Sequence, residues 1–202
     1  MKIAVIGSGN VGSALGKAWT RAGHEVIFGV REEKAKGSAG GSKTAPVPQA
    51  IRDSEVVVLA VPSQAVPDVI GQFDNWASKI IVDCTNPLTK DLELAQGFNT
   101  SAAEQTASLA KSKKVVKAFN TTGAGNMENT KYDGKPITMF FATDDAAAQK
   151  VGEQLVRDAG FEPVFAGPLK QSRYLEPMAA LWISMAIKHG YGTNFAFTMA
   201  RR

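Results

Sequence analysis

The sequence predicts an α/β fold, in which a doubly wound and mostly parallel sheet is followed by a short C-terminal helical extension. Three observations support this prediction. Short apolar runs alternate with amphipathic stretches of helical period, as in βαβ units. The first run, residues 3–6, stops abruptly in a glycine-rich turn at residues 7–12. The third run, EVVVLAV at residues 55–61, is uniformly apolar, which is typical of a strand buried on both faces.

The glycine-rich turn has the pattern G-x-G-x-x-G and lies between a predicted strand and a predicted helix at residues 11–22. Gly7 permits a tight turn, Gly9 lets a pyrophosphate approach the backbone, and Gly12 lets the helix lie close to the strand. The helix then directs its free N–H groups at the phosphates. We interpret the turn as the dinucleotide site of a Rossmann fold. The alternative is a structural turn without a ligand.

The residue after the second strand favours NADP over NAD. NAD sites carry an acidic residue about twenty positions beyond the glycines. Here the second strand ends in Gly29-Val30 and Arg31 follows, while Glu32 and Glu33 lie past the strand end. An arginine can form paired hydrogen bonds to a 2′-phosphate. The alternative for Arg31 is a solvated loop charge.

The rest of the chain continues the alternation, apart from residues 33–44, which are rich in Lys, Gly and Ser. This segment is either a loop that folds over the adenosine end of the cofactor or a plain connector. In chain order we then predict a helix (46–51), a strand (55–61), a helix (64–72), a strand (79–83), a helix (102–110), two strands (114–119 and 136–142), a helix capped by Asp144 and ended by Gly160, and a last strand (161–165).

Polar residues follow several of these strands, where ligands bind in open α/β sheets. Asn86 precedes a proline, so its amide either meets the ribose of the nicotinamide or forms an Asx turn. The polar loop 120–125 opens on the same edge. Cys84 is interpreted as a small buried residue and His24 as structural, so no acid–base or metal-binding group is predicted.

The C-terminal stretch places an apolar stripe on one helical face. The stripe forms core or subunit contacts, or in addition lines a pocket for a flat ring; its members are Leu175, Met178, Ala179, Trp182 and Ala186. Pro177 either kinks this helix or marks its first turn. We expect residues 1–168 to form the dinucleotide-binding domain and residues 169–202 the helical extension, although the two could count as one domain. We also expect a homodimer.

Composition limits the function classes. The chain has 202 residues, of which 44% are hydrophobic and 21% charged, as in ordinary globular proteins. No apolar window is long enough for a membrane span, no signal peptide precedes the first strand, and there is one cysteine, so we expect a cytoplasmic protein. The net charge of +4 comes entirely from residues 1–45, where Lys and Arg outnumber the acidic residues. This positive charge suits a polyanionic cofactor but is too small to indicate nucleic-acid binding.

Five pieces of the sequence resemble the coenzyme F420-dependent NADP reductase family, which also includes the reductase domains of membrane ferric reductases. These pieces are IGSGNVGSALG, GHEVIFGVREEK, AVPSQA, DCTNPL and AGPLKQSRYLEPMAALWI. The resemblance implies an NADP-binding doubly wound sheet with a small C-terminal portion. It also implies direct hydride transfer between NADP(H) and a deazaflavin or flavin ring, with coenzyme F420, FMN or FAD as the second substrate.

The resemblance further implies roles for individual residues. The pyrophosphate would bind at Ser8, Gly9, Asn10 and Val11, the 2′-phosphate at Arg31, and the nicotinamide end at Val61, Pro62, Asn86 and Asn120. Many relatives have a hydroxyl residue before the arginine, where this chain has Val30. Selection of the 2′-phosphate therefore depends more on Arg31, together with Lys34 or Lys36.

Hydride transfer between two rings needs alignment and exclusion of water rather than a proton donor at carbon. The leading hypothesis is therefore an oxidoreductase that acts on a planar redox substrate. One alternative is an NADP(H)-dependent reductase of a small metabolite, a class that usually needs a longer helical domain after the sheet. Another is a non-catalytic module that senses NADP(H).

Overall fold

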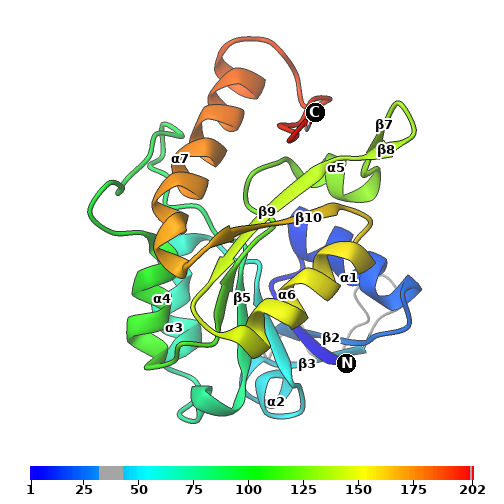
Figure 1. Cartoon of the computed structure of the whole chain (residues 1–202). Helices are drawn as coiled ribbons and strands as arrows, with labels where there is room; N and C mark the ends of the chain where they lie inside the picture. Colours follow the sequence, from blue (N-terminus) through cyan, green and yellow to red (C-terminus); the bar gives the residue numbers. More distant parts are fainter. Residues whose placement is uncertain (32–42, 201) are drawn as a thin grey trace.

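One eight-stranded sheet forms the centre of the computed structural model, which describes residues 1–31, 43–200 and 202 (Figure 1). The strand order is β10-β9-β6-β5-β4-β1-β2-β3. All neighbours in this sheet are parallel except β6 and β9. The strands are β1 (Lys2–Ile6), β2 (Glu25–Val30), β3 (Lys43–Pro46), β4 (Val56–Leu59), β5 (Ile80–Asp83), β6 (Val115–Lys117), β9 (Thr138–Thr143) and β10 (Glu162–Gly167).

Helices cover both faces of the sheet. They are α1 (Asn10–Arg21), α2 (Val47–Arg52), α3 (Val66–Ile70), α4 (Ala102–Ala110), α5 (Ala124–Glu128), α6 (Ala146–Asp158) and α7 (Ser172–Ile183). Shorter turns are η2 (Ser63–Ala65), η3 (Trp76–Ser78), η4 (Leu169–Gln171) and the π-helical η5 (Ser184–Lys188). One core packs α1 and α6 on the sheet, and a second packs α2, α3 and α4 on the opposite face (Figure 1). The predicted doubly wound, mostly parallel fold is confirmed.

The sheet has a topological switch point beside β1, where the order in which strands are added reverses. From β1 the chain proceeds through α1 to β2 and β3, and α2 then returns it to β4 on the other side of β1. In open α/β sheets the crevice at such a switch point, beyond the carboxyl ends of the strands, is where ligands bind. The residues that follow β1, β2, β4, β5 and β6 therefore share one edge of the molecule.

Several predicted boundaries are wrong. Lys43 and Thr44, predicted as loop, begin β3, which pairs with β2. Residues 33–42 lie outside the described part of the chain. Whether this segment folds over the adenosine end of the cofactor or is a plain connector therefore stays a prediction. The polar loop 120–125 is shorter than predicted because α5 begins at Ala124.

The predicted cap of α6 is off by one residue. Asp145 is the N-cap, and its side chain accepts a hydrogen bond of 2.8 Å from the backbone N–H of Ala148. Asp144 instead accepts a hydrogen bond of 3.0 Å from the backbone N–H of Leu169, so it holds the turn before α7.

A small hairpin, β7 (Lys131–Tyr132) and β8 (Lys135–Pro136), is absent from the prediction. Its turn residues Asp133 and Gly134 have φ angles of +50° and +76°. Asp-Gly is a strong signal for such a turn, so the sequence did carry the information.

The apolar stripe of α7 packs inward. Leu175, Ala179, Trp182 and, in η5, Ala186 are buried, which confirms their core role, whereas Met178 is half-buried. Trp182 stacks on Phe195 of the C-terminal segment, with ring centroids 5.2 Å apart. Pro177 lies inside α7, so the first-turn alternative is wrong. The domain boundary at residue 168 and the homodimer stay predictions. Among the described residues, no helix is long and apolar enough to cross a bilayer.

Candidate functional site

The glycine turn has the three features that its pattern predicts. Gly7 has a φ of +105°, and a Cβ there would lie 2.5 Å from the carbonyl oxygen of Ala60. A Cβ on Gly12 would lie 2.0 Å from the carbonyl oxygen of Gly7. At Gly9, by contrast, an added Cβ would meet no described heavy atom within 4 Å. Gly7 and Gly12 are therefore required by the fold, whereas Gly9 leaves the backbone open to a ligand.

The N-terminus of α1 can bind an anion. Its N-cap is Gly9, whose lack of a side chain leaves the first turn without a side-chain cap, and that turn contains no acidic residue. Helix N-termini carry unpaired N–H groups and a partial positive charge. Ser8 and Asn10 are exposed beside them, and Val11 is half-buried. The Ser13 hydroxyl donates to the carbonyl of Ser8 at 2.9 Å, which braces the turn.

Arg31 lies at the same edge, directly after β2. It is exposed, and no carboxylate of the described residues pairs with it. Its position beside the carboxyl end of β1 suits a phosphate on the adenosine ribose. Lys34 and Lys36, the other predicted cations, lie outside the described residues.

The structure brings Asn86 and Asn120 together, although they are 34 residues apart. Asn86 Nδ2 donates to the carbonyl of Asn120 at 3.0 Å, and Asn120 Nδ2 donates to Asn86 Oδ1 at 3.1 Å. Asn120 Nδ2 also donates to the carbonyl of Leu175 in α7 at 3.0 Å. The Asn86 side chain is thus engaged across the edge rather than in an Asx turn. Val61 and Pro62 follow β4 at this edge, so all four residues implied for the nicotinamide end are neighbours of the crevice.

Sequence reasoning missed a buried ionic cluster beneath this edge. Lys117 Nζ lies 3.4 Å from Asp83 Oδ1 and 3.0 Å from Glu176 Oε1, and all three side chains are at most 1% exposed. Burial by itself would favour the neutral amine, but the two carboxylates outweigh it and raise the pKa of Lys117. The lysine is therefore charged.

Hydrogen bonds satisfy the carboxylates of this cluster. Asp83 accepts from the hydroxyls of Thr85 and Thr106. Glu176 accepts from the backbone N–H groups of Ala102 and Ala103 at the N-terminus of α4. The cluster thus joins β5, β6, α4 and α7 beside Asn86 and Asn120. Its signal in the sequence was a lysine inside a strand that otherwise reads as apolar.

Neither Cys84 nor His24 is placed to act in catalysis. Cys84 is 7% exposed, and burial, followed by the charge of Asp83, raises the pKa of its thiol. A neutral buried thiol is a poor nucleophile, so its interpretation as a structural residue holds. His24 lies at the amino end of β2, opposite the candidate site, and its Nε2 lies 2.8 Å from Asp158 Oδ2. Among the described residues no group of three or more His, Cys, Asp or Glu could hold a metal.

Comparison with known proteins tests the family resemblance. Residues 2–87, which include the glycine turn, Arg31 and Asn86, match the family described as NADP oxidoreductase, coenzyme F420-dependent. The family resemblance is confirmed. A crystal structure of a protein proposed to be an F420-dependent NADP reductase from Arthrobacter sp. FB24 matches with a TM-score of 0.87 and 27% identity, over 100% of both chains.

Two further similar proteins are longer than this chain. Metalloreductase STEAP3 from Rattus norvegicus is 30% identical over 87% of this chain and 36% of its own length. This chain therefore spans about a third of the length of the curated relatives that it matches. An imine reductase from Streptomyces aurantiacus shares the fold, with a TM-score of 0.68 at 17% identity, over 94% of this chain and 64% of the other. The comparisons thus show that residues 2–87 are similar to a family of NADP-dependent oxidoreductases.

Proposed function

We propose that the protein is an NADP-dependent oxidoreductase that transfers a hydride between NADP(H) and a deazaflavin, such as coenzyme F420, or a flavin. The observation that carries the proposal is the open, uncapped N-terminus of α1 at Gly9, with the exposed Arg31 directly after the adjacent strand β2. The family description and the name of the Arthrobacter protein support the choice of cofactor and acceptor.

Different residues at this edge of the sheet would bind different parts of NADP(H). The turn at Ser8, Gly9, Asn10 and Val11 would hold the pyrophosphate, with the dipole of α1 offsetting its charge. Arg31 would bind the 2′-phosphate, and Lys34 would add to it. Val61, Pro62, Asn86 and Asn120 would orient the nicotinamide.

Orientation is the main contribution that this site would make to the reaction. Bound NADPH supplies the hydride, and the chain has to hold donor and acceptor atoms about 3–3.5 Å apart in a site without water. The mutual hydrogen bonds of Asn86 and Asn120, and their link to α7, fix these side chains, which would then form a rigid wall beside the nicotinamide. No proton donor at carbon is needed.

Anaerobic oxidation of NADPH tests the proposal. We expect absorbance at 340 nm to fall when the protein is mixed with NADPH and either FMN or a deazaflavin, and to stay constant without an acceptor. Turnover with imines or carbonyl compounds but with neither ring would favour a reductase of small metabolites. Tight NADPH binding without turnover against any of these acceptors would favour a sensing module.

Replacing Arg31 with alanine should remove most of the preference for NADPH over NADH. Loss of a charge-assisted contact costs about 1.5–3 kcal/mol, which corresponds to roughly 10–150-fold in the dissociation constant for NADPH. Affinity for NADH should change little, since NADH lacks the 2′-phosphate. Fluorescence titration with both coenzymes measures the ratio.

The matched control for this variant is Arg21→Ala. Arg21 is an exposed arginine in the last turn of α1, far from the glycine turn. An Arg31→Ala protein that kept the NADPH preference of the Arg21→Ala control would rule out the assigned role of Arg31.

A further inference from the structure

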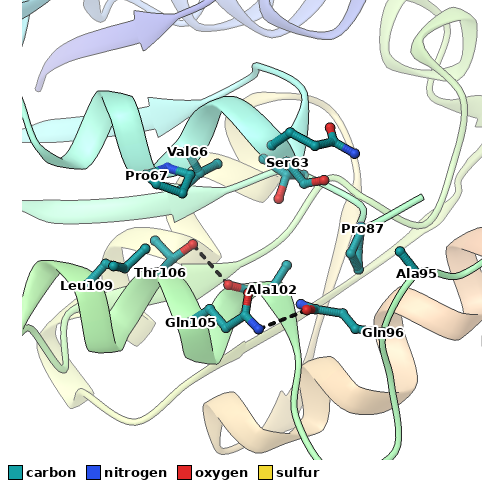
Figure 2. A pocket seen from close by; sticks show the side chains of 12 residues that line it. Ser63, Val66, Pro67, Pro87, Ala95, Gln96, Ala102, Gln105, Thr106 and Leu109 are labelled. Atoms are coloured by element: carbon teal, nitrogen blue, oxygen red, sulfur yellow. Dashed lines mark hydrogen bonds between the residues drawn. The ribbon is translucent and has the colours of Figure 1, made fainter. Parts of the chain in front are cut away.

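A cavity of about 240 Å³ lies between α3 and α4. Figure 2 shows its two long walls, one from η2 and α3 with Ser63, Val66 and Pro67, and the other from α4. Residues of the segment after β5, Pro87, Ala95 and Gln96, close one end (Figure 2).

The lining of the cavity includes sequence neighbours of the residues assigned to the nicotinamide end. Ser63 directly follows Pro62, and Thr85 and Pro87 flank Asn86 on either side. A ligand in the cavity would therefore have one end next to the residues proposed to orient the nicotinamide. Ligand sites commonly have volumes of about 300–1,000 Å³, so this cavity is suited to part of a ligand rather than to a whole one.

The lining of the cavity is uncharged. It combines apolar surface from Val66, Pro67, Pro87 and Leu109 with hydroxyl and amide groups. A phosphate or carboxylate would lose hydration there without gaining a cationic partner, which disfavours charged groups. The lining therefore favours a neutral group that has both apolar surface and hydrogen-bonding atoms.

The polar groups of the lining differ in how many hydrogen-bond donors and acceptors remain free for a ligand. The hydroxyls of Thr85 and Thr106 already donate to Asp83. Gln105 Nε2 donates to Gln96 Oε1 at 2.8 Å (Figure 2), and Gln64 Nε2 donates to the carbonyl of Leu88 at 3.1 Å. Each glutamine amide has two N–H donors and an oxygen with two lone pairs, so these three side chains retain both donors and acceptors.

We propose that this cavity receives the dioxopyrimidine edge of the acceptor ring, in which an N–H donor lies between two carbonyl acceptors. Glutamine amides pair with such an edge in both directions, and the apolar walls cover the ring faces. The inference rests on the proposed function and adds to it the place where the acceptor binds. It also accounts for a cavity that is neutral although the neighbouring cofactor site is cationic.

Equilibrium binding of riboflavin to the NADP⁺-loaded protein tests the proposal without turnover. Riboflavin carries the dioxopyrimidine edge and no phosphate, and its fluorescence reports binding. We expect Ala95→Phe, which fills the cavity, and Gln105→Leu, which removes an amide, each to weaken riboflavin binding at least tenfold. Both positions are exposed, so the variants should keep the wild-type melting temperature and affinity for NADP⁺.

Two controls test separately whether the cavity itself and the dioxopyrimidine edge of the ligand are responsible for binding. Ala147→Phe adds the same bulk at an exposed position of α6, on the other face of the sheet, and should bind riboflavin as the wild type does. A riboflavin methylated at N3, which lacks the central N–H donor, should bind the wild type at least tenfold more weakly.

Riboflavin affinity that is the same in Ala95→Phe, Gln105→Leu and the wild type would overturn the proposal, as would a wild type that does not bind riboflavin. Failure of the proposed function is a separate result, namely no NADPH oxidation with either FMN or a deazaflavin. If the wild type oxidises NADPH but the cavity variants bind riboflavin normally, only the proposed role of the cavity is rejected. If the cavity variants bind riboflavin more weakly but the wild type does not oxidise NADPH, only the proposed hydride transfer is rejected.

Discussion

Replacing Lys117 with alanine should destabilise the protein by about 3–5 kcal/mol, the range observed when one partner of a buried ion pair is removed. The substitution leaves Asp83 and Glu176 buried with no cation. It also removes the lysine's hydrogen bond to the carbonyl of Thr85, beside the candidate nicotinamide site. Unfolding in urea, followed by circular dichroism, measures the change.

Two further variants separate the charge from the packing. Lys113→Ala removes an exposed lysine close in sequence and should change stability by less than about 0.5 kcal/mol. In a Glu176→Gln background, removal of Lys117 should cost less than it does in the wild type, because one of the unpaired carboxylates is gone. A Lys117→Ala protein as stable as the Lys113→Ala control would contradict the ionic role of the cluster.

The fold was predictable where the sequence pattern has a single physical meaning. The uniformly apolar run of β4 and the glycine turn after β1 each have few alternatives, and both were located correctly. Lys43–Pro46 was missed because an edge strand buries little surface, so its composition resembles a loop. The switch point could be inferred, since it follows from the order of strands and the rule for their carboxyl ends.

The site was predictable only one segment at a time. Asn86 and Asn120 were placed at one edge by the parallel-sheet rule, but their mutual hydrogen bonds depend on the register of β5 and β6. The cluster of Lys117 joins β5, β6, α4 and α7, and a single lysine in a strand does not reveal its partners. The cavity between α3 and α4 was not predictable, because neutral residues from three segments leave no charge or spacing pattern.

A methyl group at Gly9 should impair the cofactor site while leaving the fold intact. An alanine there would meet no described atom within 4 Å, and the φ of −71° suits any residue. Loss of a glycine N-cap should cost no more than about 1 kcal/mol. The new methyl would lie where the pyrophosphate approaches the backbone, and a cofactor displaced by about 1 Å loses alignment for hydride transfer. We therefore expect kcat/KM for NADPH to fall about 100-fold.

Gly12→Ala provides the contrast that makes the Gly9→Ala result interpretable. Its Cβ would lie 2.0 Å from the carbonyl oxygen of Gly7, so α1 would have to move away from the turn. Such overpacking costs about 1–3 kcal/mol or more, and the melting temperature should drop together with NADPH binding. Gly9→Ala should instead keep the melting temperature within a few degrees and lose NADPH affinity. If Gly9→Ala bound NADPH as tightly as the wild type, the pyrophosphate would not lie against this turn, and the open backbone at α1 would need another explanation.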